Sequence, residues 1–171
     1  MLTRLVAVVR QLIGDTGASP VFSDAELEEF LVPYARTHVR LALEPAEPLP
    51  AKLWVAREGY WADGARVETG ADGVTVASEQ PIAGRWELSE PVFGPVRVTG
   101  RTYDVYAAAA DALEVWAARE KLAYDVTVDG QSLRRSQIGS RLLELAQHYR
   151  RQARPRLARQ IREDAEAALW S

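Results

Sequence analysis

The sequence predicts a mainly α fold: a small helical bundle with an inserted antiparallel β-hairpin or small sheet and a C-terminal helix. Apolar residues recur at helical spacing at both ends of the 171-residue chain. In the middle they alternate with polar residues, which is the spacing of a half-buried strand. The expected organisation is N-terminal helices in residues 1–44, a β-rich module in 45–101, core helices in 102–152 and a C-terminal helix in 153–171.

The first expected element is a short amphipathic helix that ends at Gly14. Its apolar face comprises Leu2, Leu5, Val9, Leu12 and Ile13. After a loop rich in turn formers, Ser23 and Glu26 have the spacing of a capping box at the start of a second helix. The apolar face of that helix comprises Leu27, Phe30, Leu31 and Tyr34. Pro33 is expected either to end this helix or to begin another helical segment, which carries Val39, Leu41 and Leu43.

Glu44–Pro50 contains three prolines and is expected to be a stiff, extended linker to the β-rich module. The expected strands are Tyr60–Trp61, Arg66–Thr69, Val74–Ala77, Arg85–Leu88 and Val96–Thr99, separated by turns at Asp63–Gly64 and Asp72–Gly73. Three tryptophans, Trp54, Trp61 and Trp86, are either core residues or anchors of an interface. Since an unpaired sheet edge invites aggregation, we expect the module to pack on a neighbour.

Helical spacing returns at Tyr103, Tyr106, Ala107, Ala110, Leu113 and Ala117. Four successive alanines favour a helix and allow another backbone to approach closely. A turn at Asp129–Gly130 then leads to a helix whose expected inward residues are Ile138, Leu142, Leu145, Ala146 and Tyr149. Pro155 is expected to interrupt it, and a short helix follows with Leu157, Ile161, Ala165 and Leu169 as its apolar positions.

Composition argues against most catalytic chemistries. The chain has no cysteine, and its two histidines, His38 and His148, lack metal-ligand spacing to another histidine. No glycine-rich phosphate loop is present. We therefore expect a protein that is not an enzyme, with no catalytic, cofactor-binding or metal-binding residues. An enzyme on an unrecognised α+β scaffold rests on no residue that the sequence singles out. Because no apolar run approaches about 20 residues and the start lacks signal-peptide features, a soluble cytoplasmic protein is expected.

Charge is unevenly distributed along the chain. Residues 1–133 hold 12 basic and 20 acidic residues, whereas residues 134–171 hold nine arginines and four acids. The nine are Arg134, Arg135, Arg141, Arg150, Arg151, Arg154, Arg156, Arg159 and Arg162. They either contact an acidic protein partner or phosphates, or form a solvated face whose stems cover apolar surface. Opposite charge at the two ends favours head-to-tail association or docking on a charged neighbour.

Three segments resemble the head-to-tail connector (adaptor or head-completion) proteins of tailed bacteriophages. The first runs from Leu5 to Thr16 and continues at Phe22–Leu27; the second is Thr102–Glu114; the third extends from Tyr124 to Gln137 and contains Asp129–Gly130 and Arg135–Ser136–Gln137. Together the segments lie in the two helical ends, about two thirds of the chain. The β-rich middle departs from the smallest, all-helical members.

The resemblance implies a structural virion protein at the head–tail junction, made in the host bacterial cytoplasm. Its expected partners are copies of itself in a ring, typically a dodecamer, the portal protein, and a stopper or tail-completion protein. DNA would pass through the ring without sequence-specific binding, and no membrane is involved. The C-terminal helix would dock on the portal through Arg151, Arg154, Arg156, Arg159, Arg162, Leu169 and Trp170. The residues expected to pack subunits are Tyr103, Tyr106, Ala107, Ala110, Arg134 and Arg135. The alternative function is a small nucleic-acid-binding or regulatory protein that uses the arginine-rich C-terminal helices.

Overall fold

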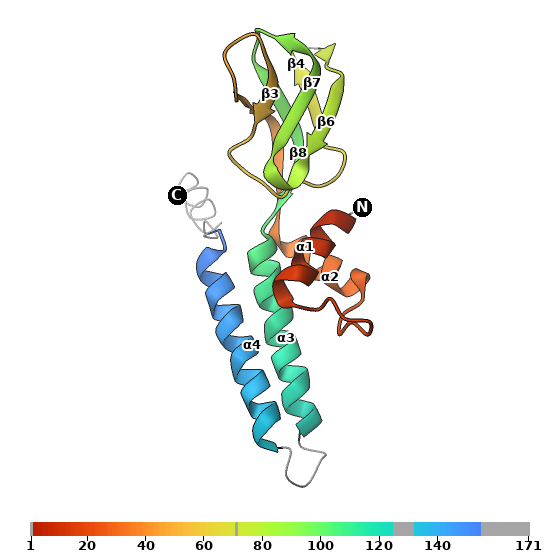
Figure 1. The fold of residues 1–171 in the computed structure, drawn as a ribbon, viewed down its shortest axis with the longest axis vertical. Coiled ribbons are helices and arrows are strands. Elements are labelled where there is room, and N and C mark those ends of the chain that lie inside the picture. The colour runs from red at the N-terminus through yellow and green to blue at the C-terminus, as the bar shows by residue number, and fades with distance from the viewer. Residues whose placement is uncertain (1, 71, 125–131, 155–171) are drawn as a thin grey trace, which may run out of the picture.

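The computed structural model describes residues 2–70, 72–124 and 132–154, which form a helical part and a β-sheet part (Figure 1). The helices are α1 (Thr3–Ile13), α2 (Asp24–Leu31), the 3-10 turns η1 (Val32–Tyr34) and η2 (Pro81–Ala83), α3 (Val105–Tyr124) and α4 (Ser132–Gln152). The strands are β1 (Ala35–Ala42), β2 (Glu44–Pro45), β3 (Ala51–Val55), β4 (Arg66–Thr69), β5 (Asp72–Gly73), β6 (Val76–Gln80), β7 (Arg85–Val92) and β8 (Val96–Tyr103). They make two four-stranded antiparallel sheets, sheet A in the order β1-β8-β4-β5 and sheet B in the order β2-β3-β7-β6.

The expectation of a mainly α fold was wrong, because the described residues combine helices with two complete antiparallel sheets. Of the two alternatives at Pro33, the end of the helix is confirmed, because α2 ends at Leu31 and Pro33 lies in η1. A further helical segment after Pro33 was wrong, because β1 occupies these residues. Val39, Leu41 and Leu43 are spaced two residues apart, which is strand spacing. Leu41 pairs with Val98 on β8, and Leu43 is buried in the core. A bulge after His38 leaves Val39 on the surface.

The proline-rich segment 44–50 was expected to link two modules, but it lies inside the β part. Its first two residues form β2, and the rest is the loop that leads into β3. The Glu47 carboxylate holds this loop by accepting hydrogen bonds from the backbone N–H groups of Lys52 (2.6 Å) and Leu53 (3.2 Å). Prolines indicate extended backbone but do not reveal whether that backbone has a strand beside it.

Other strand expectations were partly right. Arg66–Thr69 is β4, and the runs beginning at Arg85 and Val96 extend further than expected as β7 and β8. Asp72–Gly73 was expected as a turn but is the short strand β5. Tyr60–Trp61 contributes only a single bridge, from Trp61 to Thr102. The strands thus begin at residue 35 and end at residue 103, beyond both limits of the expected 45–101 module.

The two sheets enclose an apolar core in which the three tryptophans are buried. Trp54, Trp61 and Trp86 are at most 2% exposed, and the rings of Trp61 and Trp86 meet edge to face with centroids 5.5 Å apart. Of the two roles left open by the sequence, the core role is the observed one. The sheet edges are blunted: β1 and β6 are interrupted by bulges, and β2 and β5 have two residues each. An unpaired edge is therefore a weaker reason to expect a neighbour than the sequence suggested.

The helical part is built on α3, which lies between α4 on one side and α1 and α2 on the other (Figure 1). The predicted end of α1 is confirmed, since Gly14 adopts a left-handed conformation with φ 73°. The capping box of Ser23 and Glu26 at the start of α2 is confirmed as well. Four alanines of α3, residues 107–110, are all buried and let its neighbours pack closely.

On α4, most of the expected inward residues pack against the helical core: Leu142, Leu145, Ala146 and Tyr149. Ile138 differs, because its side chain is 44% exposed. The expected turn at Asp129–Gly130, the interruption at Pro155 and the helix beyond it lie outside the described residues.

Candidate functional site

The end of α4 meets the β part at a polar junction centred on Arg154. The guanidinium Nη1 donates to Glu58 Oε2 at 3.0 Å and to Thr102 Oγ1 at 3.3 Å, and Nη2 donates to the Gly59 carbonyl at 3.5 Å. Arg154 was expected to bind the portal. In the structure its side chain joins the last described turn of the chain to the β part.

Asp104, the residue between β8 and α3, fixes the same junction through its carboxylate. Oδ1 accepts a hydrogen bond from the backbone N–H of Ala107 (3.1 Å), which is the usual contact of an N-cap residue. Oδ2 accepts from the backbone N–H of Arg154 at 2.6 Å. One 8% exposed carboxylate therefore starts α3 and holds the chain just after α4.

Glu58 also contacts two basic side chains of sheet A. Its carboxylate lies 3.1 Å from His38 Nε2 and 3.7 Å from Arg36 Nη1. Burial lowers the pKa of His38; the Glu58 carboxylate acts in the opposite direction, and Arg36 and Arg154 add to the lowering. The Thr102 hydroxyl lies 2.9 Å from the same His38 nitrogen. Nucleophile–base–acid triads use both imidazole nitrogens, so this arrangement fits a structural cluster better than a catalytic one.

Arg150, one turn earlier on α4, is paired within the chain as well. Its guanidinium contacts Asp111 and lies 3.0 Å from Glu114 Oε2, both on α3, and donates to the Tyr34 hydroxyl at 3.2 Å. Hydrogen bonding to Glu114 is the main cause that raises the pKa of Arg150. These contacts tie the two long helices to each other and to η1.

The remaining residues expected at the portal interface divide into two groups. Arg151 is exposed and forms no ion pair with any side chain that the structure describes. The others lie outside the described residues: Arg156, Arg159, Arg162, Leu169 and Trp170.

The residues expected to pack subunits are mostly used inside the chain. Ala107 and Ala110 are buried at 3% and 0% exposure. Tyr103 is the last residue of β8 and not a helix residue, because α3 begins at Val105. Tyr106 accepts a hydrogen bond from the Tyr60 hydroxyl at 3.2 Å. Arg134 and Arg135 lie in the first turn of α4, and the described contacts do not include their side chains.

Tyr60, Tyr106 and Tyr149 form an aromatic contact between the two parts. The ring centroid of Tyr106 lies 5.9 Å from the ring centroid of Tyr60 and 5.9 Å from that of Tyr149. Burial, followed by the hydrogen bond to Tyr106, raises the pKa of Tyr60 to about 12. Tyr149 in turn donates to the Leu12 carbonyl at 2.9 Å, so the cluster reaches from the β part to α1.

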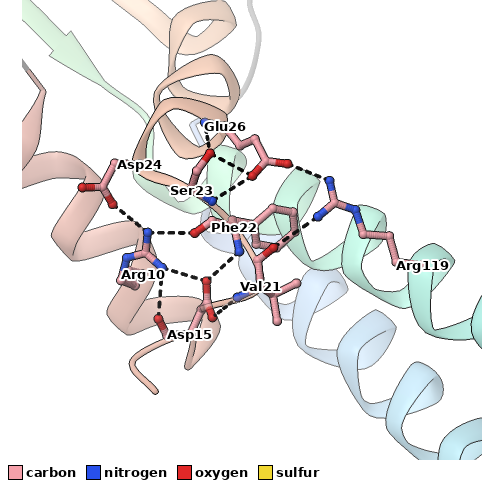
Figure 2. A network of polar contacts seen from close by, with 8 residues as sticks. All are labelled: Arg10, Asp15, Val21, Phe22, Ser23, Asp24, Glu26 and Arg119. Carbon is pink, nitrogen blue, oxygen red and sulfur yellow. Dashed lines mark hydrogen bonds and ion pairs between the residues drawn. The ribbon is translucent and has the colours of Figure 1, made fainter. Parts of the chain in front are cut away.

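A second polar network orders the connection between α1 and α2 (Figure 2). The buried Asp15 carboxylate accepts from the backbone N–H groups of Val21 (2.7 Å) and Phe22 (3.1 Å) and pairs with Arg10 Nη1 at 2.8 Å. Arg119 on α3 closes the network by pairing with Glu26 at 2.9 Å. Its guanidinium carbon also lies 4.7 Å from the centre of the Phe22 ring.

Sequence reasoning missed Glu58, Thr102 and Asp104 at the junction. For Asp104 a signal existed, because an aspartate just before an alanine-rich helix is a typical N-cap. For Glu58 no local pattern distinguishes it from a solvated glutamate, since its partner Arg154 is 96 residues away.

Two further observations bear on function. Among the described residues, no three histidine, aspartate or glutamate side chains are grouped so that they could hold a metal ion. Within the same ranges no helix has the length and apolar character needed to cross a membrane.

The chain matches no protein-family model, no curated protein and no solved structure.

Proposed function

We propose that this protein is a structural component of a tailed-phage virion, assembling as a ring between the portal and the tail or stopper. The observation that carries the proposal is the packing of segments that resemble connector proteins. Residues of α1, α2 and α3 from those segments, far apart in sequence, share one core in which Leu5, Leu27 and Leu113 are each at most 1% exposed. The β part is inserted between α2 and α3, at one end of this helical unit (Figure 1).

Contacts from several elements join the helical part to the β part. Arg154 bonds to the β part, Asp104 joins β8 to α3 and α4, and the tyrosine cluster spans the boundary. A ring of identical subunits needs two different patches at a fixed relative angle on every copy. Rigid coupling of the helical and β parts would supply that fixed geometry.

The alternative of a nucleic-acid-binding protein that uses the C-terminal arginines is less well supported. Arg150 and Arg154 are paired with carboxylates of the same chain, and a phosphate would have to compete with those partners. Both belong to the cluster of nine arginines on which that alternative was based.

Electron microscopy of the protein mixed with the portal protein of the same genome tests the proposal. A ring that continues the portal channel is expected, and monomers that ignore the portal under all conditions would contradict it. A chain ending at Arg154 should keep the contacts of Arg154 with Glu58 and Asp104, and therefore its fold, but lose attachment to the portal. Circular dichroism of the shortened chain provides the folding control. Attachment that survives the truncation would overturn the docking role of residues 155–171.

A further inference from the structure

The outward face of sheet A carries a cluster of positive charge that the linear sequence does not display. Val96, Val98 and Thr102 of β8 are buried with 0% exposure, so the residues that alternate with them, Arg97, Thr99 and Arg101, face outward. Directly paired residues of an antiparallel sheet share a face. Arg66 of β4 is paired with Thr99, and Thr37 of β1 with Arg101, so both belong to this outward face.

Arg40 joins the cluster from the bulge of β1. Its backbone N–H donates to Thr99 Oγ1 at 3.0 Å, and its Nε lies 2.9 Å from the Glu68 carboxylate on β4. Because β8 lies between β1 and β4, the Arg40 side chain reaches Glu68 across the outward face of β8. We call this surface the basic face and define it by Thr37, Arg40, Arg66, Glu68, Arg97, Thr99 and Arg101.

The basic face has four arginines against one carboxylate. Glu68 is already paired with Arg40, whereas Arg66, Arg97 and Arg101 form no ion pair with a described side chain. Two other carboxylates lie at the end of the face where Arg101 stands: Glu28 and Asp63 line a cleft together with Arg101. Arg97 and Arg101 are four residues apart on one strand, about 13 Å, and Arg66 lies about 5 Å to the side of the line between them.

We propose that the basic face contacts the phosphate backbone of duplex DNA without reading its sequence. Guanidinium and hydroxyl groups are among the side-chain donors that contact phosphates in protein–DNA complexes. Of the seven residues that define this face, none is aromatic; beside them lie two aliphatic residues of β1, Ala42, which is paired with Arg97, and the exposed Val39, which precedes Arg40 in the bulge. Single-stranded nucleic acid would call for aromatic stacking platforms, and an acidic protein partner would call for an apolar centre in its interface. A duplex backbone requires neither.

This inference rests on the proposed function for its setting, because a ring at the head–tail junction encloses passing DNA. It adds which surface of the subunit faces that DNA. It also moves the expected DNA contact away from the arginines of α4 and the C-terminal residues, where the sequence alone would place it.

The test uses the full-length chain and a labelled duplex of mixed sequence, with binding followed by fluorescence anisotropy between about 50 and 200 mM salt. The R66Q/R97Q/R101Q variant removes three charges from the basic face. We expect it to weaken binding by about tenfold or more at low salt, and to flatten the slope of log K against log salt by about 0.9 per arginine removed. The lysine variant R66K/R97K/R101K keeps the charge and should keep most of the slope.

A matched control removes the same charge from the other sheet. Lys52 and Arg85 lie on strands of sheet B and Arg57 follows β3; all are outside the basic face, and K52Q/R57Q/R85Q should bind duplex DNA like the unmodified protein. Equal loss in both triple variants, or no loss in the first, would overturn the proposal. So would a polyglutamate chain that competes as well as DNA, because the surface would then fit an acidic polypeptide.

The same samples separate this inference from the proposed function. Rings with portal but no DNA binding by the basic face would overturn the inference alone. DNA binding that depends on Arg66, Arg97 and Arg101 in a protein that never forms rings would overturn the proposed function and leave the inference standing.

Discussion

Replacing Asp15 with asparagine is expected to destabilise the protein far more than the same change at Asp24. Both carboxylates pair with Arg10, at 2.8 Å and 2.6 Å respectively (Figure 2). They differ in exposure, because the Asp15 side chain is 3% exposed and the Asp24 side chain 74%. The pair of variants therefore isolates the effect of burial on one arginine's two partners.

The magnitude for Asp15→Asn follows from the contacts that are lost. Asparagine keeps one acceptor oxygen, so its amide nitrogen faces at least one of the backbone N–H groups of Val21 and Phe22. A buried N–H without an acceptor costs about 1–3 kcal/mol, and the lost charge-assisted bond to Arg10 about 1.5–3 kcal/mol. Since Arg10 keeps its bonds to the Phe22 carbonyl and Asp24, the lower part of each range applies. We expect about 3 kcal/mol in total.

For Asp24→Asn the expected loss is below about 1 kcal/mol, because exposed ion pairs contribute about 0.2–1 kcal/mol. Urea unfolding followed by circular dichroism measures both values. In thermal unfolding, about 2–4 °C per kcal/mol for a chain of this length predicts that Asp15→Asn lowers the Tm by roughly 10 °C. Equal losses in the two variants, or a loss under about 1 kcal/mol for Asp15→Asn, would refute the assignment of Asp15 as the residue that orders the α1–α2 connection.

Three further changes test the fold and the junction. Gly84→Ala should lower the free energy of unfolding, measured in urea, by about 3 kcal/mol, and Gly14→Ala should lower it by only about 1 kcal/mol. Both glycines have positive φ, but a Cβ at Gly84 would lie 2.5 Å from the Glu58 carbonyl and one at Gly14 would meet nothing within 4 Å; similar losses would contradict this. The lowered pKa of His38 means that the unfolded chain binds more protons, so the free energy of unfolding should rise with pH up to about 6.5. His38→Gln should flatten that rise, and an unchanged slope would argue against burial as the cause. A double-mutant cycle of Glu58→Gln and Arg154→Gln should give a coupling of about 0.5–1 kcal/mol, since the two side chains are 29% and 30% exposed; zero coupling would mean that the pair does not hold the junction.

Local signals in the sequence predicted local structure well. The capping box of Ser23 and Glu26, the end of α1 at Gly14 and the strand Arg66–Thr69 each depend on residues within a few positions of one another. The error at β1 has a different origin. Its pairing partner, β8, is about 60 residues away, and the bulge after His38 leaves Val39 on the surface although Leu43, with the same two-residue spacing, is buried. Without the partner, Val39, Leu41 and Leu43 were assigned, in one of two alternatives, to a further helical segment that begins at Pro33.

The polar junction at Arg154 was harder to predict because its contacts join residues that are far apart in the sequence. Arg154 belongs to a basic C-terminal region and was therefore expected to bind a partner, yet Glu58 neutralises it within the same chain. A charged side chain near a terminus is available to a partner only if the fold leaves it unpaired. That condition depends on contacts which no local pattern records.

The same reasoning explains why the positive charge on sheet A could not be predicted from the linear sequence. Residues 1–133 contain eight more acidic than basic residues, so the net charge of this stretch is negative. Strand pairing nevertheless brings Arg66, Arg97 and Arg101 onto one side of sheet A, while acids of the same strands, apart from Glu68, are absent from that side. Because successive strand residues point to opposite faces, a strand can be neutral in sequence and charged on one side. The charge that a partner meets is set by the register between strands, and we therefore expect substitutions on β8 and β4 to affect DNA binding more than substitutions of the paired arginines on α4.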